Sequence, residues 1–419
     1  MSGSVTGDPT LPYGGPARVV SLGVVLLHAD ASSPIAIGLA VRPVDRAAHL
    51  AFALDLAAGP RPDAGAVSFL QCPAWGDLKE GWRAESVGWF RGSELVGTAL
   101  VLYRALPRTR HCLAYVPEGP LIDWYGERTP YLIRDWLLPF AAYLRGRGAF
   151  TAKIGPRIIT RTWSAQTVKR AVADGGHNRL GDIPADTCDP RAEQVLDELR
   201  ALGWHRPRGA ADGYRDFQPR YHYRLPLSGR DEAQLLAEFS TQWRRNIRAA
   251  ERAGVAVVRA GAADLPEFHR LYLETAVRDG FTPRPLEYFQ RMFRVFAQED
   301  ADRIRLYLAR RGGHALAAAT VVRLGPYAWC SHAASATEGR ESRPSNALHW
   351  RIARDCLTDR NLVYDLRGIG DTLDPGHHLF GLLRFNAGLG GEAVEYCGEW
   401  DLPINGVLHH AFQAYLARR

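Results

Sequence analysis

The chain has 419 residues and a formal net charge of +7 at pH 7, and 46% of its residues are hydrophobic. This length is enough for two or three domains with apolar cores. No apolar run reaches the roughly 18 to 20 residues of a membrane-spanning helix. The longest early run, 19–27, lacks the basic start and the cleavage site of a secretory signal. We therefore expect a soluble, cytoplasmic protein.

The six cysteines are scattered, without a C-x-x-C pair and without a histidine at metal-ligand spacing. The sequence therefore predicts no metal site and no disulfide framework. The pI of about 9.2 suits a polyanionic partner, although charge alone does not select nucleic acid over a phosphorylated lipid. Lysine occurs only at Lys79, Lys153 and Lys169, so each of these residues merits attention.

The first half of the chain is predicted to form one α/β unit. Residues 1–34 are rich in Gly, Pro and Ser and are expected to form a flexible leader. Hydrophobic periodicity then predicts strands at 35–41, 86–91, 95–106, 111–116 and 149–154, and helices at 44–56, 73–80, 130–145 and 164–173. The polar segment 174–220, interrupted by a helix at 190–202, is interpreted as a connector. We place the domain boundary at 185/186.

The second half repeats a similar series. The predicted helices are 231–253, one opened at 264, one opened at 285, 347–358, 379–385 and 406–419, and the predicted strands are 221–227, 255–259, 303–309, 316–323, 327–334, 362–366 and 393–397. The second unit is predicted to span 186–402. The C-terminal segment 403–419 is expected to join the first unit.

The helix predicted at 231–253 has two faces. Apolar residues recur every four positions on one face, and Arg244, Arg248 and Arg252 form a basic stripe on the other, joined by Arg245. Such a row of arginines can follow the phosphates of a nucleic acid. A solvated face balanced by nearby glutamates is the alternative interpretation.

The order of elements in each half is strand, two helices, three strands, helix, strand. This order resembles a GNAT-type acyltransferase, so the predicted fold class is α/β (α+β), with two GNAT-like domains in tandem. Such a unit splays two parallel strands apart and leaves a cleft for an acyl donor and an amine. The segment where such enzymes carry a CoA-binding glycine loop reads TEGRESRPSN here. An acetyl-CoA donor is therefore disfavoured.

Residues 361–405 hold the densest group of glycines and turn residues, and we expect them to form a wall of the active site. Glycine lets the backbone approach a ligand closely. The alternative, that Gly388, Gly390 and Gly391 only end a helix and permit a tight turn, stays open.

Several segments carry a family resemblance, and they read FLQCPAWGDLKEGWRAE, LAYVPEGPLIDW, AKIGPRII, QPRYHYRLPL, QWRRNIRAAERAGV, FTPRPLEYFQRM, RIRLYLAR, RPSNALHW, YDLRGIGDTLDP and GGEAVEYCGEWDLPIN. With them the chain, from about Ile35 onward, resembles the FemABX family and is most similar to its FemX-like members. These are aminoacyl-tRNA-dependent peptidyltransferases that add amino acids to peptidoglycan precursors.

The resemblance implies transfer of an aminoacyl group from a tRNA ester to an amine of a UDP-linked or lipid-linked muropeptide. Neither a metal nor a cofactor is expected, because the ester is already activated. Aminoacyl-tRNA and a phosphorylated muropeptide would be the partners, and a peripheral membrane contact is left open. Two alternatives remain: a small secondary-metabolite amine as the acceptor, and a catalytically weak binding paralogue.

The resemblance also implies roles for particular residues. Lys79 and an arginine of QWRR, Arg244 or Arg245, would bind the acceptor phosphates, because guanidinium and ammonium groups form charge-assisted hydrogen bonds with phosphate. Asp123 falls where the family has a carboxylate proposed to take a proton from the amine. A structural cap or turn role for Asp123 is the alternative. Arg248 and Arg252 would contact tRNA.

The sequence departs from its relatives at the predicted site. Asn386 follows Arg384 and Phe385 where relatives read Phe-Lys, and that lysine is expected to stabilise the oxyanion or steer the tRNA end. An amide can still donate a hydrogen bond there but carries no charge. Cys330 and His332 replace aromatic residues of relatives and would reshape the acceptor pocket.

Overall fold

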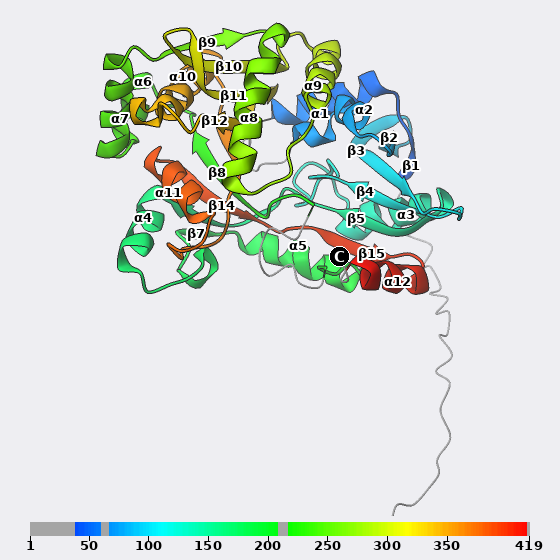
Figure 1. The fold of residues 1–419 in the computed structure, drawn as a ribbon. Helices are drawn as coiled ribbons and strands as arrows, with labels where there is room; N and C mark the ends of the chain where they lie inside the picture. The colour runs from blue at the N-terminus through cyan, green and yellow to red at the C-terminus, as the bar shows by residue number, and fades with distance from the viewer. Residues whose placement is uncertain (1–37, 60–66, 208–216, 417–419) are drawn as a thin grey trace, which may run out of the picture. The chain divides into compact units, whose positions relative to one another are not determined.

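The structure is a computed structural model that describes residues 38–59, 67–207 and 217–416. The predicted leader lies outside the described residues. The first part of the chain forms β1 (Ala40–Pro43), α1 (Arg46–Ala57), α2 (Pro73–Leu78), β2 (Arg83–Arg91), β3 (Glu94–Ala105), β4 (Cys112–Val116), α3 (Ile133–Gly146), β5 (Ala149–Ile154), β6 (Ile159–Ser164), α4 (Ala165–Asp174), β7 (Thr187–Cys188) and α5 (Pro190–Ala201) (Figure 1).

The second part repeats the pattern. Its elements are β8 (Tyr221–Pro226), α6 (Glu232–Glu238), α7 (Thr241–Arg252), β9 (Ala256–Ala260), α8 (Leu265–Asp279), α9 (Leu286–Glu299), β10 (Ile304–Arg311), β11 (His314–Leu324), β12 (Tyr327–Ser335), α10 (Pro344–Thr358), β13 (Val363–Gly368), α11 (Phe380–Gly388), β14 (Glu392–Tyr396), β15 (Trp400–Pro403) and α12 (Gly406–Leu416).

The elements build two sheets. One has the order β1-β2-β3-β4-β5-β15, and the other has the order β7-β6-β14-β8-β13-β12-β11-β10-β9. In each sheet a three-stranded antiparallel run is followed by a helix and a parallel strand, β4 with β5 and β12 with β13. The doubled α/β order predicted from the sequence is therefore confirmed.

The two sheets exchange strands near their shared border. The chain leaves the first sheet after β5, so β6 and β7 belong to the second sheet, and it returns to the first sheet with β15. The division between the sheets therefore does not coincide with the 185/186 boundary predicted from composition. Composition marks where the chain is polar, whereas strand pairing decides which sheet a segment joins.

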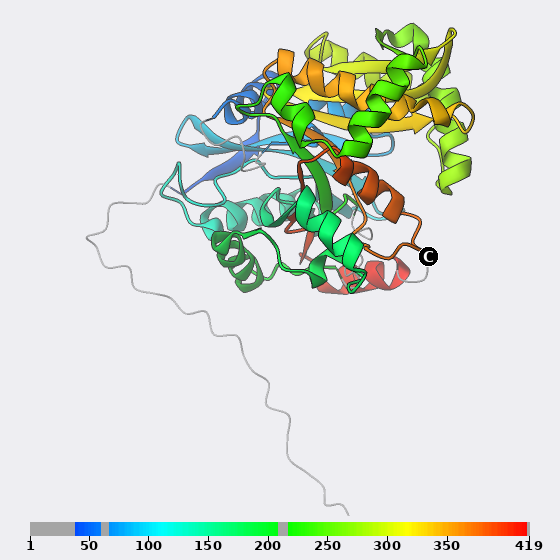
Figure 2. The same ribbon diagram turned by 90° about the vertical axis from the view of Figure 1, so that its left-hand side faces the viewer.

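A shared apolar core joins the two halves. It packs α2 and its preceding turn, through Phe69 and Leu78, against α8 and α9, through Phe268 and Phe296. Figure 2 shows the second half, coloured green to orange, beside the blue-to-cyan strands of the first. Separate cores lie between the first sheet and α3 and between the second sheet and α10.

The single helix predicted at 231–253 is two helices, α6 and α7. The break lies at Phe239, whose backbone is extended, and Ser240, whose side chain accepts a hydrogen bond from the Trp243 amide. Serine is a favoured N-cap because its oxygen satisfies an amide that has no partner inside the helix. The four-residue apolar spacing continues through the break and therefore conceals it.

Candidate active site

Strand β12 carries a bulge at Ser331, because Thr320 pairs with His332 while the adjacent Val321 pairs with Cys330. Bulges re-aim side chains and are frequent at functional sites. Thr320 Oγ1 lies 2.8 Å from Ser331 Oγ and 3.4 Å from His332 Nδ1. Below the bulge β12 pairs with β13 over three residues only, so the two parallel strands diverge beyond Trp329.

Of the two predicted pocket residues in β12, His332 faces α8 and α9. Its ring centroid lies 5.1 Å from that of Phe289, 5.9 Å from Tyr272 and 6.2 Å from Tyr288. Burial, together with the positive charges of Arg284, Arg367 and Lys79, lowers the pKa of His332 to about 3. The imidazole is therefore neutral at physiological pH and acts only as a hydrogen-bonding group.

Cys330 lies instead in the core between the second sheet and α10. Burial raises the pKa of its thiol to about 12, so the group stays protonated. The bulge separates the two neighbours: it sends His332 toward α8 and α9 and leaves Cys330 in the interior.

Lys79 follows α2 and lies close to His332. Its Nζ is 4.0 Å from the centroid of the Trp75 ring. Burial and the nearby Arg284 lower the pKa of Lys79 to about 8. Within the described part of the chain no carboxylate forms an ion pair with Lys79 or Arg284. We call Lys79 and Arg284 the cationic cluster; the neutral His332 borders it, and the two positive charges favour an anion.

The arginines predicted to accompany Lys79 lie elsewhere. Arg244 donates to the carbonyls of Ala237 and Phe239, at 2.9 and 2.6 Å, and so caps the C-terminal end of α6. Arg245 is exposed on α7. Helices α2 and α7 lie on opposite sides of the upper half of Figure 1. The structure therefore does not bring Arg244 or Arg245 to Lys79, and Arg284 occupies that place.

Asp123 is saturated by its own loop. Its carboxylate accepts hydrogen bonds from the backbone amides of Glu127, Arg128 and Thr129, at 3.1, 2.7 and 2.7 Å, and from the Thr129 hydroxyl at 3.1 Å. Only 5% of the residue is exposed. This geometry is that of a loop cap, the alternative that the sequence left open.

The three predicted residues of α11 point in different directions. Arg384 is exposed. Phe385 packs between α7 and α10, because its ring lies 4.7 Å from Trp243 and 5.7 Å from His349. Asn386 is 2% exposed, and its Nδ2 has no hydrogen-bond partner among the described residues. Burying an amide donor without a hydrogen-bond partner costs free energy. The Nδ2 of Asn386 can therefore donate to an oxygen of a ligand or water.

The glycines that follow α11 have structural roles. A Cβ at Gly388 would lie 2.0 Å from Trp243 Cδ1, so only glycine lets α7 approach α11. Gly390 and Gly391 have φ values of 76° and 72°, a region that side chains disfavour. Gly390 and Gly391 thus fit the tight-turn interpretation, whereas Gly388 ends α11 and permits the packing of α7 against it.

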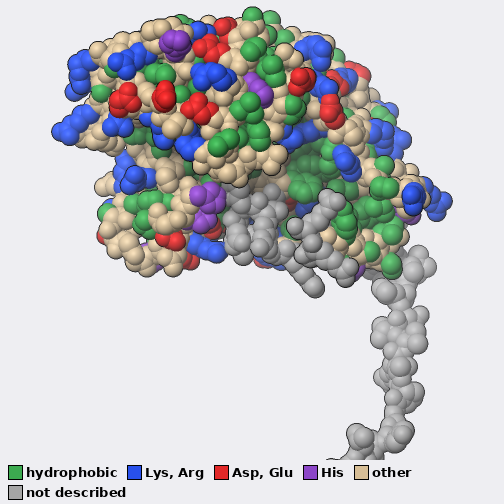
Figure 3. Space-filling model, viewed as in Figure 1, with side chains coloured by type: hydrophobic (Ala, Val, Ile, Leu, Met, Phe, Trp, Pro, Cys, Tyr) green, Lys and Arg blue, Asp and Glu red, His purple; other side chains and the backbone are tan. Residues whose placement is uncertain are grey.

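Arg248 and Arg252 are exposed on α7 and form no ion pair within the described ranges. Figure 3 shows Lys and Arg side chains gathered on the left, over α6 and α7. The stripe predicted from the sequence is therefore available to a polyanion, without Arg244, whose guanidinium is used in the helix cap.

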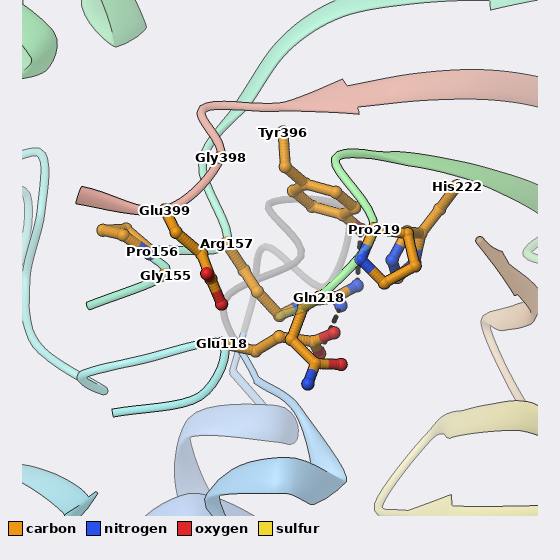
Figure 4. Close-up of a pocket in the computed structure, with 10 residues that line it drawn as sticks. All are labelled: Glu118, Gly155, Pro156, Arg157, Gln218, Pro219, His222, Tyr396, Gly398 and Glu399. Atoms are coloured by element: carbon orange, nitrogen blue, oxygen red, sulfur yellow. Dashed lines mark hydrogen bonds and ion pairs between the residues drawn. The ribbon is translucent and has the colours of Figure 1, made fainter. Parts of the chain in front are cut away.

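A buried ion network joins the two halves (Figure 4). Arg157 contacts Glu118 at 2.8 Å and Asp365 at 3.3 Å. Arg367 contacts the other Glu118 oxygen at 2.7 Å, and His222 lies 3.0 Å from Asp365. Burial alone would raise the pKa of Glu118, but Arg367 and Arg157 lower it to about 2. These paired carboxylates are therefore poor proton acceptors.

The ion network borders a cavity of about 20 Å³, lined also by Gln218, Pro219 and Tyr396. This volume holds about one water molecule. No group of three or more His, Cys, Asp or Glu side chains in the described ranges could hold a metal ion. The network is a support for the divergent end of β13 rather than a binding cavity.

Sequence reasoning missed Arg284, Arg367 and Glu118. Arg284 stands in the segment FTPRPLEYFQRM, four residues before Tyr288, whose ring its guanidinium approaches to 5.2 Å. The signal that could have identified Arg284 is its position four residues before an aromatic residue, next to the start of a helix. Arg367 and Glu118 meet only through tertiary contacts.

Two GNAT-like units with a cationic cluster beside divergent strands define an acyltransferase fold. The model of the FemAB family matches residues 63–311 and 307–417, and the chain belongs to that family. It is 26% identical over 237 residues to the lipid II:glycine glycyltransferase of Staphylococcus aureus (strain MRSA252), which covers 56% of this chain and 48% of the relative. The same values hold for the enzyme of strain USA300.

The chain therefore spans about half the length of these curated relatives. Among solved structures, the crystal structure of FemX matches with a TM-score of 0.71 and 19% identity, covering 89% of this chain and 99% of FemX. This likeness extends to the whole fold. Among the described residues, no helix combines the length and apolarity needed to cross a bilayer.

Proposed function

We propose that the protein transfers an aminoacyl group from an aminoacyl-tRNA to an amine of a peptidoglycan precursor. The observation that carries this proposal is the cationic cluster. Its positive charges have no carboxylate partner among the described residues, so they can bind the phosphates of an acceptor. Family membership supports acyl transfer, and the curated relatives named above act on lipid II. Either a UDP-linked or a lipid-linked precursor supplies the phosphates.

In the proposed reaction the acceptor nitrogen bonds to the ester carbonyl carbon, and the bond from that carbon to the ribose oxygen breaks. Of the ammonium protons, one goes to the leaving hydroxyl and one to solvent. Lys79 and Arg284 bind phosphate and so fix the acceptor. Asn386 donates to the oxygen that becomes negative in the tetrahedral intermediate. Asp123 is already saturated and holds its loop in place.

The rival acceptor is a small secondary-metabolite amine. The neutral His332 and the uncharged Asn386 favour it, because both depart from what the family resemblance implies. The cationic cluster favours the phosphorylated precursor, because an uncharged amine would leave Lys79 and Arg284 without a counter-ion.

One experiment tests the proposed reaction. The protein is incubated with a pool of charged tRNAs and with a UDP-linked muropeptide, lipid II or small amines, and the products are read by mass spectrometry. We expect a mass gain of one amino acid on a phosphorylated precursor, abolished by ribonuclease. Arg284→Met should lower the yield, whereas Arg294→Met, an exposed residue of α9, is the matched control. Modification of a small amine alone would establish the rival.

A binding paralogue would give a different outcome: RNA binding without transfer, and transfer restored by Asn386→Lys. Robust transfer by the wild-type protein would rule this possibility out.

Salt dependence tests the RNA surface separately. We expect the affinity for tRNA to fall steeply with salt, and Arg248→Ala with Arg252→Ala to reduce the logarithmic slope by about 1.4 to 1.8, since each phosphate contact contributes roughly 0.7 to 0.9. Arg134→Ala with Arg145→Ala on α3, on the opposite side of the molecule, is the control. An unchanged slope would show that α7 is only a solvated face.

A further inference from the structure

A groove of about 580 Å³ lies at the N-terminal end of α11, in the loop that joins β13 to this helix and beside the segment that follows α4. Its volume is in the range of small-ligand sites. The groove is lined in part by Arg179, Asp371, Asp374, His377, His378 and Leu379. These residues lie outside the candidate active site.

Two histidines form an exposed aromatic platform in the groove. The rings of His377 and His378 are stacked, with centroids 4.4 Å apart and an interplanar angle of 28°. Nδ1 of His377 accepts a hydrogen bond from the Leu379 amide at 3.2 Å, which fixes this ring and leaves Nε2 as the donor of the neutral form. Unpaired nucleobases stack on exposed aromatic rings of this kind.

The charge of the groove indicates which part of a nucleotide the groove can bind. Asp371 and Asp374 outnumber Arg179, so the groove disfavours a phosphate. One carboxylate oxygen of Asp374 accepts from the Gly376 amide at 2.8 Å, and the residue is exposed. Carboxylates accept hydrogen bonds from the exocyclic amino group of cytosine. The groove therefore fits the edges and faces of bases.

The groove lies one helix away from the proposed transfer site. From Phe380, where α11 begins, to Asn386 is six residues, or about 9 Å at 1.5 Å per residue. This distance is close to that of three stacked bases at roughly 3.4 Å each. Helix α4 packs on α11 through Val168 and Leu383, and Arg170 and Arg384 are exposed on these helices, outside the groove, where they can meet phosphates.

We propose that this groove binds the unpaired 3′-terminal bases of the RNA co-substrate, stacking them on His377 and His378 and reading a cytosine amino group with Asp374. The inference rests on the proposed function, because it assumes an RNA donor. The groove then places the RNA end at the start of α11, the helix that carries Asn386 near its other end.

Binding of uncharged RNA tests the inference without transfer. The probes are a fluorescent acceptor-stem hairpin with its single-stranded 3′ end and the same hairpin lacking its last three nucleotides, compared by anisotropy. We expect the wild-type protein to prefer the complete RNA. His378→Ala, which leaves the His377 cap intact, should reduce that preference at least about fivefold, since stacking on one aromatic residue has an effect of this size.

Three variants sharpen the test. His378→Trp should keep the preference, because indole also stacks, and His314→Ala, an exposed histidine of β11, is the control. Asp374→Asn should reduce discrimination between 3′ cytosines and uracils. Equal affinities of His378→Ala and the wild type for the complete RNA would overturn the inference and leave the proposed function standing. Absence of RNA binding by the wild-type protein would overturn both.

Discussion

Replacing Lys79 by Met should stabilise the unliganded protein while weakening acceptor binding. Burial and Arg284 lower the pKa of Lys79 from 10.5 to about 8, so the fold disfavours the ammonium. At about 1.4 kcal/mol per pKa unit this cost is about 3.4 kcal/mol, and partial solvent contact reduces it to roughly 1 to 3 kcal/mol. Lys79→Met should raise the free energy of unfolding at pH 7 by that amount.

The sign of the pH dependence follows from proton binding. Below pH 8 the folded and unfolded chains both carry the proton, and the full cost is present. Between pH 8 and 10.5 the unfolded chain binds more protons, so the stability of the wild-type protein rises with pH. The Lys79→Met protein should lack this rise.

Lys79→Met should weaken acceptor binding, although it stabilises the fold. A charge-assisted hydrogen bond contributes about 1.5 to 3 kcal/mol, so Lys79→Met should raise the KM for a phosphorylated acceptor roughly 10- to 150-fold. In the wild-type protein affinity should also fall above pH 8, as the ammonium is lost. Lys79→Arg should bind the acceptor without this decline, because guanidinium stays protonated.

The assays are urea denaturation at pH 7 and 9.5 and acceptor KM between pH 6.5 and 9.5. A Lys79→Met protein that is less stable than the wild type and has an unchanged KM would refute the reasoning. So would a Lys79→Arg protein that still loses affinity above pH 8.

Three further predictions concern α11, the loop of Asp123 and the buried His49. Gly388→Ala should lower the free energy of unfolding by about 1 to 3 kcal/mol and lower transfer, because its Cβ would overlap Trp243. Gly381→Ala, with open space around it, is the control and should be neutral or stabilise α11 by about 0.5 to 1 kcal/mol. Denaturation curves of the two variants give the comparison. Asp123→Asn should lower stability by about 1 to 3 kcal/mol and leave the pH–rate profile unchanged; a 100-fold loss of kcat at full stability would identify a base instead. Burial and Arg46 lower the pKa of His49 to about 3, so acid below pH 6.5 should destabilise the wild-type protein by up to about 1.4 kcal/mol per pH unit, and His49→Gln should flatten this slope in unfolding measured against pH.

The helices show where sequence reasoning succeeded and where it stopped. Each element has its own hydrophobic period, so the order of elements could be read locally, and the doubled order was confirmed by the pairing of β4 with β5 and of β12 with β13. The break between α6 and α7 was missed because the four-residue spacing of apolar residues continues on both sides of Ser240. The exchange of β6 and β15 was missed because strand pairing is a long-range property.

The candidate site shows the same division. Sequence reasoning identified Lys79, and the structure places it in a cluster that favours anions. The structure does not bring the predicted Arg244 to Lys79, because its guanidinium caps α6. Sequence reasoning also left the role of Asp123 open, and only the loop that folds back over the carboxylate decides in favour of a cap.

By itself, then, the sequence determined the α/β class, the tandem arrangement and the family, because periodicity and motif spacing are local properties of the chain. The tertiary structure alone decided which charges meet. Arg284 reaches Lys79 only because α2 packs against α8 and α9 in the shared core, and the bulge in β12 turns His332 toward them. Which charges meet at the site of Lys79 and Arg284 depends on long-range packing, and a local sequence pattern does not contain that information.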